Sequence, residues 1–233
     1  MISRELHDDG SAPEVIALQL RNDLIEGVIA PGSRITEEAL CLRFTAGRHS
    51  VRAAIRMLLA EGLVTHERNK GALVPPITEQ RIDEMCSYRA ALELGALRIT
   101  LAGGNNDFAE VAESVEYLES LPDSTQWRTV IDAHAAIHHQ IVVTSGNQRL
   151  IRAHRDCEAE LAFMFSTIKA EYSAQRLAVV HRYLLEQLRV GGEAAIRALE
   201  EDLELGGRSA LHLALRRHRQ SESFRTVESS VAK

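Results

Sequence analysis

Apolar residues recur along most of the chain at spacings of three and four, the period of an amphipathic helix. In the first 76 residues, this pattern predicts helices at about 13–26, 36–44 and 48–61. Two short extended segments, 63–67 and 72–74, follow and flank a turn that ends at Gly71. Glycine suits such a turn because it adopts a positive φ at little cost.

Pro75 and Pro76 end this first pattern, and long amphipathic segments follow. They predict helices at about 78–101, 107–121, 126–143, 147–169, 174–190, 193–205 and 208–219. The breaks between them contain glycine, proline or serine, and the last break falls at Gly206-Gly207. Short connections between long helices favour antiparallel packing.

These elements predict a mainly α protein, in which a winged helix-turn-helix precedes an all-helical antiparallel bundle. We expect the winged helix-turn-helix to occupy residues 1–76 and the bundle residues 77–220. Residues 221–233 are rich in serine and poor in apolar side chains, which predicts a disordered tail.

Charge is distributed unevenly along the chain. The formal net charge is −6, yet residues 41–76 hold six basic residues against two acidic ones, a net +4. A basic segment on an acidic chain is typical of a small DNA-binding module, although a solvated basic surface gives the same count. The chain has no apolar segment long enough for a signal peptide or a membrane span. Its three cysteines do not have the spacing of a disulfide framework or of a CxxC metal site. We therefore expect a cytoplasmic protein.

The third predicted helix has two chemically distinct faces. Val51, Ala54, Ile55 and Leu58 form its apolar face. A neighbouring face and the turn at residues 68–71 carry the candidate DNA contacts, namely Arg48, His49, Arg52, Arg56, Arg68 and Lys70. Arginines at the start of a helix can bind guanine edges or phosphates in a major groove. The alternative is a surface helix whose arginines only contact solvent.

The whole segment resembles the DNA-binding domain of the GntR transcriptional regulators. The resemblance rests on a PG turn, a GR-x-x-VR helix start, an LLAEGLV helix end and an NKG wing, within about 64 residues. In that family the helix-start arginines contact DNA, which implies this role for Arg48 and Arg52. The chain departs from the family at Gly47, at His49-Ser50, and at Glu37-Glu38, where many members have a basic residue. The resemblance therefore implies the fold but not the operator sequence.

Several polar residues fall on the apolar faces of the later helices. Arg89 lies on the stripe formed by Ile82, Met85 and Leu92, where a guanidinium needs an anionic partner. That partner is either Glu93, one turn away, or a bound carboxylate.

Histidines show the same anomaly. His134, His138 and His181 lie on inward stripes of two helices, and converging neutral imidazoles suit a divalent metal. Satisfied core histidines are the alternative. The other histidines show no such pattern and are predicted at the surface: His7, His66, His139, His154, His212 and His218.

This second half resembles the all-helical ligand-binding domain, called FCD, of the FadR-like GntR regulators. The segment YRAALELGALRIT is similar to its R-x-x-LE signature, which implies that Arg89 contacts the effector. Members commonly bind a divalent cation, often zinc or nickel, through one Asp and three His. Two of those histidines match His138 and His181, and the usual Asp position holds His134. The last histidine is missing.

We infer an exchange, in which His134 replaces the acid and Asp202 replaces the missing histidine. The exchange requires a one-residue shortening near Gly191-Gly192. Without that shortening, Leu203 takes the position and the site has three ligands or none.

The sequence therefore predicts a DNA-binding transcriptional regulator rather than an enzyme. The resemblance to the GntR regulators implies a repressor. The expected partners are a palindromic double-stranded operator, bound by a homodimer, and a small carboxylate effector held with a divalent metal. A metal-free regulator with a decayed sensor is the alternative. A metal-dependent hydrolase is disfavoured, because no general base on a neighbouring inward stripe is evident.

Overall fold

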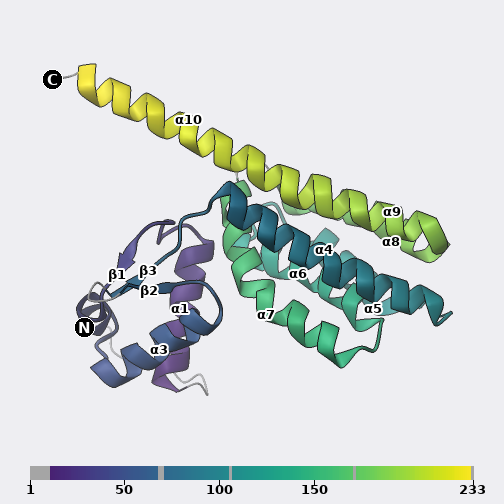
Figure 1. Cartoon of the computed structure of the whole chain (residues 1–233), viewed down its shortest axis with the longest axis horizontal. Coiled ribbons are helices and arrows are strands. Elements are labelled where there is room, and N and C mark those ends of the chain that lie inside the picture. Colours follow the sequence, from purple (N-terminus) through teal and green to yellow (C-terminus); the bar gives the residue numbers. More distant parts are fainter. Residues whose placement is uncertain (1–10, 68–70, 105–106, 170–171, 232–233) are drawn as a thin grey trace. The chain divides into compact units, whose positions relative to one another are not determined.

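The computed structural model describes residues 11–67, 71–104, 107–169 and 172–231 (Figure 1). These residues form two compact units that divide after Pro76, and Ile25–Gly27 group with the second unit. Among the described residues, helix is the main secondary structure, as the sequence predicts. No described helix is long and apolar enough to cross a membrane.

The first unit combines three helices with a small antiparallel sheet. Its elements are α1 (Ala12–Ile25), β1 (Arg34–Ile35), α2 (Glu37–Phe44), α3 (Arg48–Ala60), β2 (Thr65–Glu67) and β3 (Gly71–Leu73). The sheet has the order β1-β3-β2, and Thr65 pairs with Leu73. The described elements are those of the predicted winged helix-turn-helix, and the turn residues Arg68 and Lys70 lie outside the described residues.

Local chemistry explains why these helices begin and end where they do. Thr36 caps α2 by accepting a hydrogen bond from the Ala39 N–H at 3.2 Å. Thr45 ends α2 in a left-handed conformation with φ 50°, which lets the chain turn sharply into α3. Gly71 starts β3 with φ 84°, and a Cβ atom there would lie 3.0 Å from the Ile35 carbonyl oxygen. Glycine is therefore required at this turn for both conformation and space.

The second unit is a bundle of helices. In chain order these are α4 (Glu79–Ala102), α5 (Ala109–Ser120), α6 (Trp127–Val143), α7 (Gln148–Phe165), the 3₁₀ turn η1 (Ser166–Ile168), α8 (Ala174–Val190), α9 (Gly192–Glu201), the π-helical segment η2 (Asp202–Ser209) and α10 (Ala210–Val231). Helix α4 packs against α6, α7, α9 and η2, and α5 packs against α6 and α8 (Figure 1). The interior of this bundle holds the candidate sensor site.

The C-terminal part differs from the prediction in two ways. Gly206 and Gly207 do not break the chain, because the π-helical turn η2 carries helical backbone through them into α10. A glycine inside a helix costs only about 1 kcal/mol, which surrounding contacts can outweigh. The backbone is also helical as far as Val231, where the sequence predicts disorder from residue 221.

The connection between α8 and α9 is very short. Gly191 has φ 78° and Gly192 has φ 57°, so both glycines adopt conformations that other residues rarely take. Helix α9 starts at Gly192 itself, with no intervening loop. This tight turn fixes the position of α9 and of the Asp202 that follows it.

Candidate functional site

Helix α3 presents the predicted DNA-binding face. Val51, Ala54, Ile55 and Leu58 are buried, as the apolar pattern predicts. Arg48, His49, Arg52 and Arg56 are all exposed on the other side of the same helix. The structure therefore brings four of the six predicted contacts to one surface.

One of these arginines has a partner in the protein. The Arg52 Nε atom donates to both carboxylate oxygens of Glu37, each at 2.9 Å. The Arg52 side chain is largely exposed and that of Glu37 is partly exposed, so solvent screens the pair and the interaction is weak. Glu37 is one of the positions where the chain departs from the GntR pattern. This contact holds Arg52 in one orientation on the exposed face.

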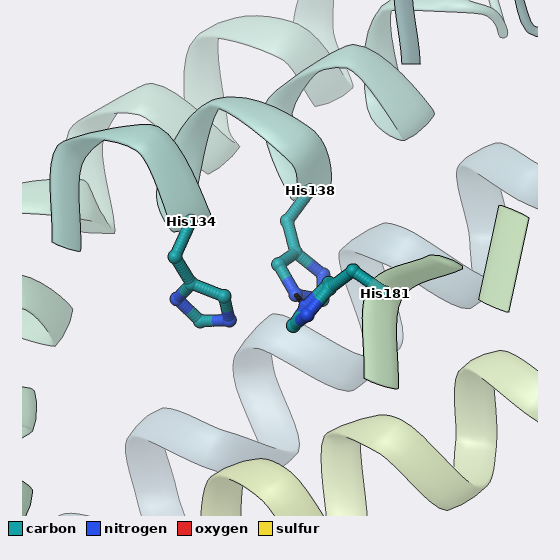
Figure 2. Close-up of side chains that lie close together, drawn as sticks. All are labelled: His134, His138 and His181. Atoms are coloured by element: carbon teal, nitrogen blue, oxygen red, sulfur yellow. Dashed lines mark hydrogen bonds between the residues drawn. The ribbon is translucent and has the colours of Figure 1, made fainter. Parts of the chain in front are cut away.

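In the bundle, two imidazoles face each other. The Nε2 atoms of His138 on α6 and His181 on α8 lie 3.1 Å apart. Figure 2 shows the two side chains directed toward each other. The exposed fractions of the two residues are 1% and 2%. Each ring has a fixed partner on its other nitrogen. The His138 Nδ1 lies 2.8 Å from Glu93 Oε2, and the His181 Nδ1 lies 2.7 Å from the Leu177 carbonyl oxygen.

These partners determine which nitrogen carries the proton. Carboxylate and carbonyl oxygens accept, so both Nδ1 atoms are donors, and a neutral ring then has its lone pair on Nε2. Two Nε2 lone pairs thus point at the same buried space, which is unfavourable without a cation between them. Carboxylate or carbonyl partners on the outer nitrogen are also the usual arrangement around metal-bound histidines. The donor set therefore fits a divalent metal.

His134 and Asp202 complete the cluster. His134 lies one turn before His138 on α6, and ligand atoms of His134, His138 and His181 lie within 4.8 Å of one another. The Asp202 carboxylate approaches from η2, with Oδ2 3.4 Å from His138 Nε2 and Oδ1 3.8 Å from His181 Nε2. The structure thus brings together the four predicted ligands, and Asp202 rather than Leu203 lies beside the imidazoles.

Burial keeps the imidazoles of His134 and His138 neutral. Loss of solvent, and the nearby His181, His138 and Arg89, hold the pKa of His134 well below its usual value. Burial and the Arg89 charge also lower the pKa of His138, although Glu93 opposes them. Neutral imidazole is the form that binds a metal.

Arg89 has the protein partner that the sequence left as one alternative. Its Nε donates to Glu93 Oε1 at 2.6 Å, and both side chains are buried. Burial alone would raise the pKa of Glu93, but Arg89 and His138 hold that pKa well below its ordinary range. Glu93 is therefore a carboxylate and not a proton donor.

Arg89 also faces a cavity of about 370 Å³, a size within the usual range for small-molecule sites. His134, His181 and Asp202 line the same cavity. Its apolar lining includes Phe165, Leu177, Val180 and Leu184. A ligand in this cavity would contact the guanidinium and the imidazole cluster together.

Two functional candidates were missed in the sequence. His154 is predicted at the surface but is 2% exposed, so that prediction is wrong. Its Nε2 lies 3.1 Å from Glu93 Oε1, and its Nδ1 lies 3.5 Å from Glu158 Oε1. His154 falls three residues after Ile151 and seven before Leu161, on the buried stripe of α7, so apolar spacing could have identified it. Glu158 is half-buried one turn further along.

The remaining histidines follow the surface prediction less closely. His66 and His218 are exposed, whereas His139 and His212 are half-buried and lie beside Glu158 and Asp83 respectively. His7 lies outside the described residues.

Known proteins resemble both units. Residues 13–74 match the bacterial regulatory proteins of the gntR family, and residues 84–205 match the FCD domain. An uncharacterized HTH-type transcriptional regulator, BphR of Paraburkholderia xenovorans (strain LB400), is 33% identical over 108 residues. That alignment covers 46% of this chain and 44% of BphR. The HTH-type transcriptional repressor GlaR of Escherichia coli (strain K12) is 28% identical over 138 residues, which are 57% of this chain and 63% of GlaR.

A solved structure supports the fold. A putative transcriptional regulator GntR from Rhodococcus sp. RHA1 aligns with a TM-score of 0.69 at 24% identity, over 87% of this chain and 99% of that one. These families and relatives are transcriptional regulators, not enzymes. The FCD match covers more than half of the chain, and the gntR match covers the winged helix-turn-helix before it. The chain therefore belongs to the GntR family of bacterial regulatory proteins and carries an FCD domain.

Proposed function

We propose that this protein is a DNA-binding transcriptional regulator, and more specifically a repressor, whose operator affinity is controlled by a small carboxylate. The effector is held in the C-terminal bundle together with a divalent cation, zinc or nickel. Regulation by a bound carboxylate rests above all on one observation. Two buried histidines, His138 and His181, direct Nε2 lone pairs at each other beside a cavity that Arg89 lines.

The DNA-binding half of the proposal rests on α3. Its exposed Arg48, Arg52 and Arg56 recur every four residues, so they form one basic face that fits a major groove. We assign His49 to the same contact surface, and Arg68 and Lys70 to the wing. A homodimer would place two such helices on the half-sites of a palindrome. The relative GlaR is itself a transcriptional repressor, which supports repression.

The sensing half rests on the donor set. His134, His138, His181 and Asp202 would hold the cation, which would supply positive charge at the cavity wall. Arg89 would bind the effector carboxylate from the side opposite the cation. Glu93 would orient Arg89 through the bond of 2.6 Å and His138 through the bond of 2.8 Å. The apolar lining of the cavity would contact the rest of the effector.

Control of DNA binding follows from differential affinity. An effector shifts an equilibrium only if it binds the DNA-competent and DNA-incompetent conformations unequally. Contacts from α4, α6, α8 and η2 converge on the cavity, so a ligand that bridges them would favour one arrangement of these helices. Arg48 and its neighbours would then be presented to DNA differently in the two arrangements.

The test uses the full-length chain and operator fragments selected from a pool of genomic DNA. Binding is measured at fixed salt with chelator, with zinc or nickel, and with the metal plus a panel of small carboxylates. We expect at least one carboxylate to change operator affinity only when metal is present. His181→Ala should abolish this response while DNA binding persists, and Arg48→Ala should weaken DNA binding while metal binding persists. A matched control, Arg197→Ala, removes an exposed arginine from α9 and should change neither property.

The same test can overturn either half. If the protein takes up no metal and no ligand changes its DNA binding, the sensing half is wrong and the protein is a regulator with a decayed sensor. Unchanged operator affinity of Arg48→Ala would refute the assignment of α3.

A further inference from the structure

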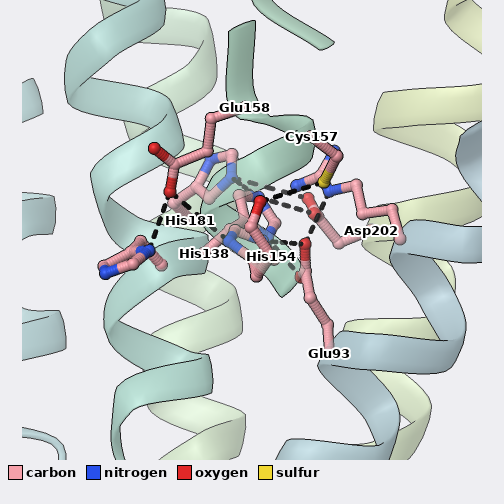
Figure 3. Close-up of polar contacts among 9 residues, drawn as sticks. Glu93, His138, His154, Cys157, Glu158, His181 and Asp202 are labelled. Carbon is pink, nitrogen blue, oxygen red and sulfur yellow. Dashed lines mark hydrogen bonds and ion pairs between the residues drawn. The ribbon is translucent and has the colours of Figure 1, made fainter. Parts of the chain in front are cut away.

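A second cluster of metal-binding side chains lies beyond Glu93, on the opposite side from the first. It consists of His139 on α6 and of His154 and Glu158 on α7. Glu158 Oε1 lies 2.7 Å from His139 Nδ1. The same oxygen lies 3.5 Å from His154 Nδ1, and Figure 3 shows Glu158 and His154 side by side. One ligand atom from each residue lies within 4.8 Å of the others. The three side chains therefore converge on one point.

The two imidazoles of this cluster lack hydrogen bonds where they converge. The Nδ1 atoms of His139 and His154 are both buried, and neither makes a hydrogen bond of acceptable geometry, even to the nearby Glu158. His154 is 2% exposed, so water does not compensate for the missing bond. A buried imidazole nitrogen without a partner is destabilising, because it has lost its hydrogen bonds to water. This cost indicates that a partner is missing from the cluster.

The orientation of His154 identifies what kind of partner would fit. Its Nε2 lies 3.1 Å from Glu93 Oε1, and because the carboxylate accepts, that nitrogen carries the proton. Burial opposes protonation, but Glu158 and Glu93 raise the pKa of His154 to about 9, so a cation would bind Nδ1 by displacing its proton. Two imidazole nitrogens and one carboxylate form a donor set that zinc uses in proteins. The carboxylate–histidine contact to Glu93 is also the usual outer arrangement of a metal-bound imidazole.

We propose that His139, His154 and Glu158 form a second divalent-cation site, separate from the cluster of His134, His138, His181 and Asp202. The Glu158 side chain is 32% exposed, so the site opens to solvent and a cation can reach it.

The two sites share their central support. His138 and His139 are neighbours on α6, and their side chains point about 100° apart around the helix, so one helix serves both sites. Between the sites, Glu93 Oε2 lies 2.8 Å from His138 Nδ1 and Glu93 Oε1 lies 3.1 Å from His154 Nε2. The same carboxylate therefore orients one imidazole of each site, as Figure 3 shows.

This arrangement makes the two sites distinguishable by the nitrogen that each uses. In the first cluster Glu93 and Leu177 occupy the Nδ1 atoms, so His138 and His181 bind a metal through Nε2. In the second cluster Glu93 occupies Nε2 of His154, so His154 binds through Nδ1. Nitrogen-15 NMR of histidine side chains distinguishes these two modes without any substitution.

The first experiment counts bound zinc per chain, by calorimetric titration and elemental analysis of the full-length protein stripped with chelator. We expect two ions for the unaltered chain. His139→Ala and Glu158→Gln should each lose one ion, and His181→Ala should lose the other. His66→Ala removes an exposed histidine from β2 and serves as the matched control, with no loss expected.

The pattern across variants separates this inference from the proposed sensor. If only the second site binds, the unaltered chain takes up one ion, which His181→Ala retains and His139→Ala loses. If uptake is the same in His139→Ala, Glu158→Gln and the unaltered chain, the second site does not exist and the cluster is an ion pair between imidazolium and Glu158.

The NMR measurement guards against variants that fail to fold. Zinc added to the unaltered chain should shift the Nδ1 resonances of His139 and His154, while their Nε2 atoms stay protonated. Zinc-induced shifts confined to Nε2 resonances would overturn the proposal.

Discussion

The two units of this protein place their functional residues in opposite environments. In the winged helix, Arg48, Arg52 and Arg56 project from an apolar core into solvent. In the bundle, Arg89 and Glu93 are buried and bonded to each other. An exposed basic face depends little on its neighbours, whereas each buried polar group depends on its partners for solvation. The DNA-binding surface can therefore change residue by residue, but the sensor must change as a set.

The largest expected effect follows from removing the central partner in the bundle. Glu93→Ala leaves Arg89 buried without its carboxylate, and removes the acceptor of His138 and His154. Breaking a buried pair in this way costs about 3–5 kcal/mol of the free energy of unfolding. Urea unfolding followed by Trp127, the only tryptophan of the chain and buried in α6, measures the loss in this unit.

The matched control for this prediction is Glu113→Ala, which removes an exposed carboxylate from α5. It should change the same free energy by less than about 0.5 kcal/mol. Equal losses in the two variants would mean that the buried network contributes nothing particular to stability.

Ligand binding should stabilise one unit only. Zinc or nickel at 100 times its dissociation constant should add about 2.7 kcal/mol to the free energy of unfolding measured through Trp127. Hydrogen exchange should slow in α6 and α8 and stay unchanged in α3. His181→Ala should remove the part of both effects that comes from the cluster of His134, His138, His181 and Asp202. Metal-dependent slowing of exchange in α3 would contradict the assignment of the metal to the bundle.

A smaller effect is expected at the DNA-binding face. Arg48→Ala should weaken operator binding by about 1–3 kcal/mol if the contact is to a base, with no change in metal affinity. Gel shifts at two salt concentrations separate a base contact from a phosphate contact, because losing a phosphate contact lowers the salt dependence. A loss of metal affinity in this variant would show that Arg48 has a role besides contacting DNA.

The smallest effect concerns the exposed pair of Arg52 and Glu37. Glu37→Gln releases Arg52 from its contacts of 2.9 Å, so operator binding should strengthen by up to about 1 kcal/mol more than in Glu38→Gln. Glu38 is exposed in the first turn of the same helix, so its substitution changes the local charge equally. Identical affinities of the two variants would show that the pair does not restrain Arg52 on DNA.

The sequence predicts the winged unit well because its signals are local. The period of Val51, Ala54, Ile55 and Leu58 defines the buried face of α3, and Thr36 marks the start of α2. In the bundle, the same spacing correctly places His134, His138 and His181 in the interior. These predictions need only the geometry of one helix at a time.

The rest of the site depends on contacts between helices, which no single period encodes. Glu93 contacts His138 on α6 and His154 on α7 because α4 packs against both of these helices. Asp202 lies beside the imidazoles at the start of η2, after the tight α8–α9 turn with its two positive-φ glycines. Gly206-Gly207 continues as helix because the π-helical turn η2 is held within the packed unit, whereas isolated propensity predicts a break.

The most direct test of the account is anomalous X-ray scattering from crystals of the full-length protein grown with zinc or nickel. The account predicts an anomalous peak between the Nε2 atoms of His138 and His181, within bonding distance of Asp202. Ordered imidazoles at that position with no anomalous peak, in crystals where metal is bound elsewhere, would contradict it.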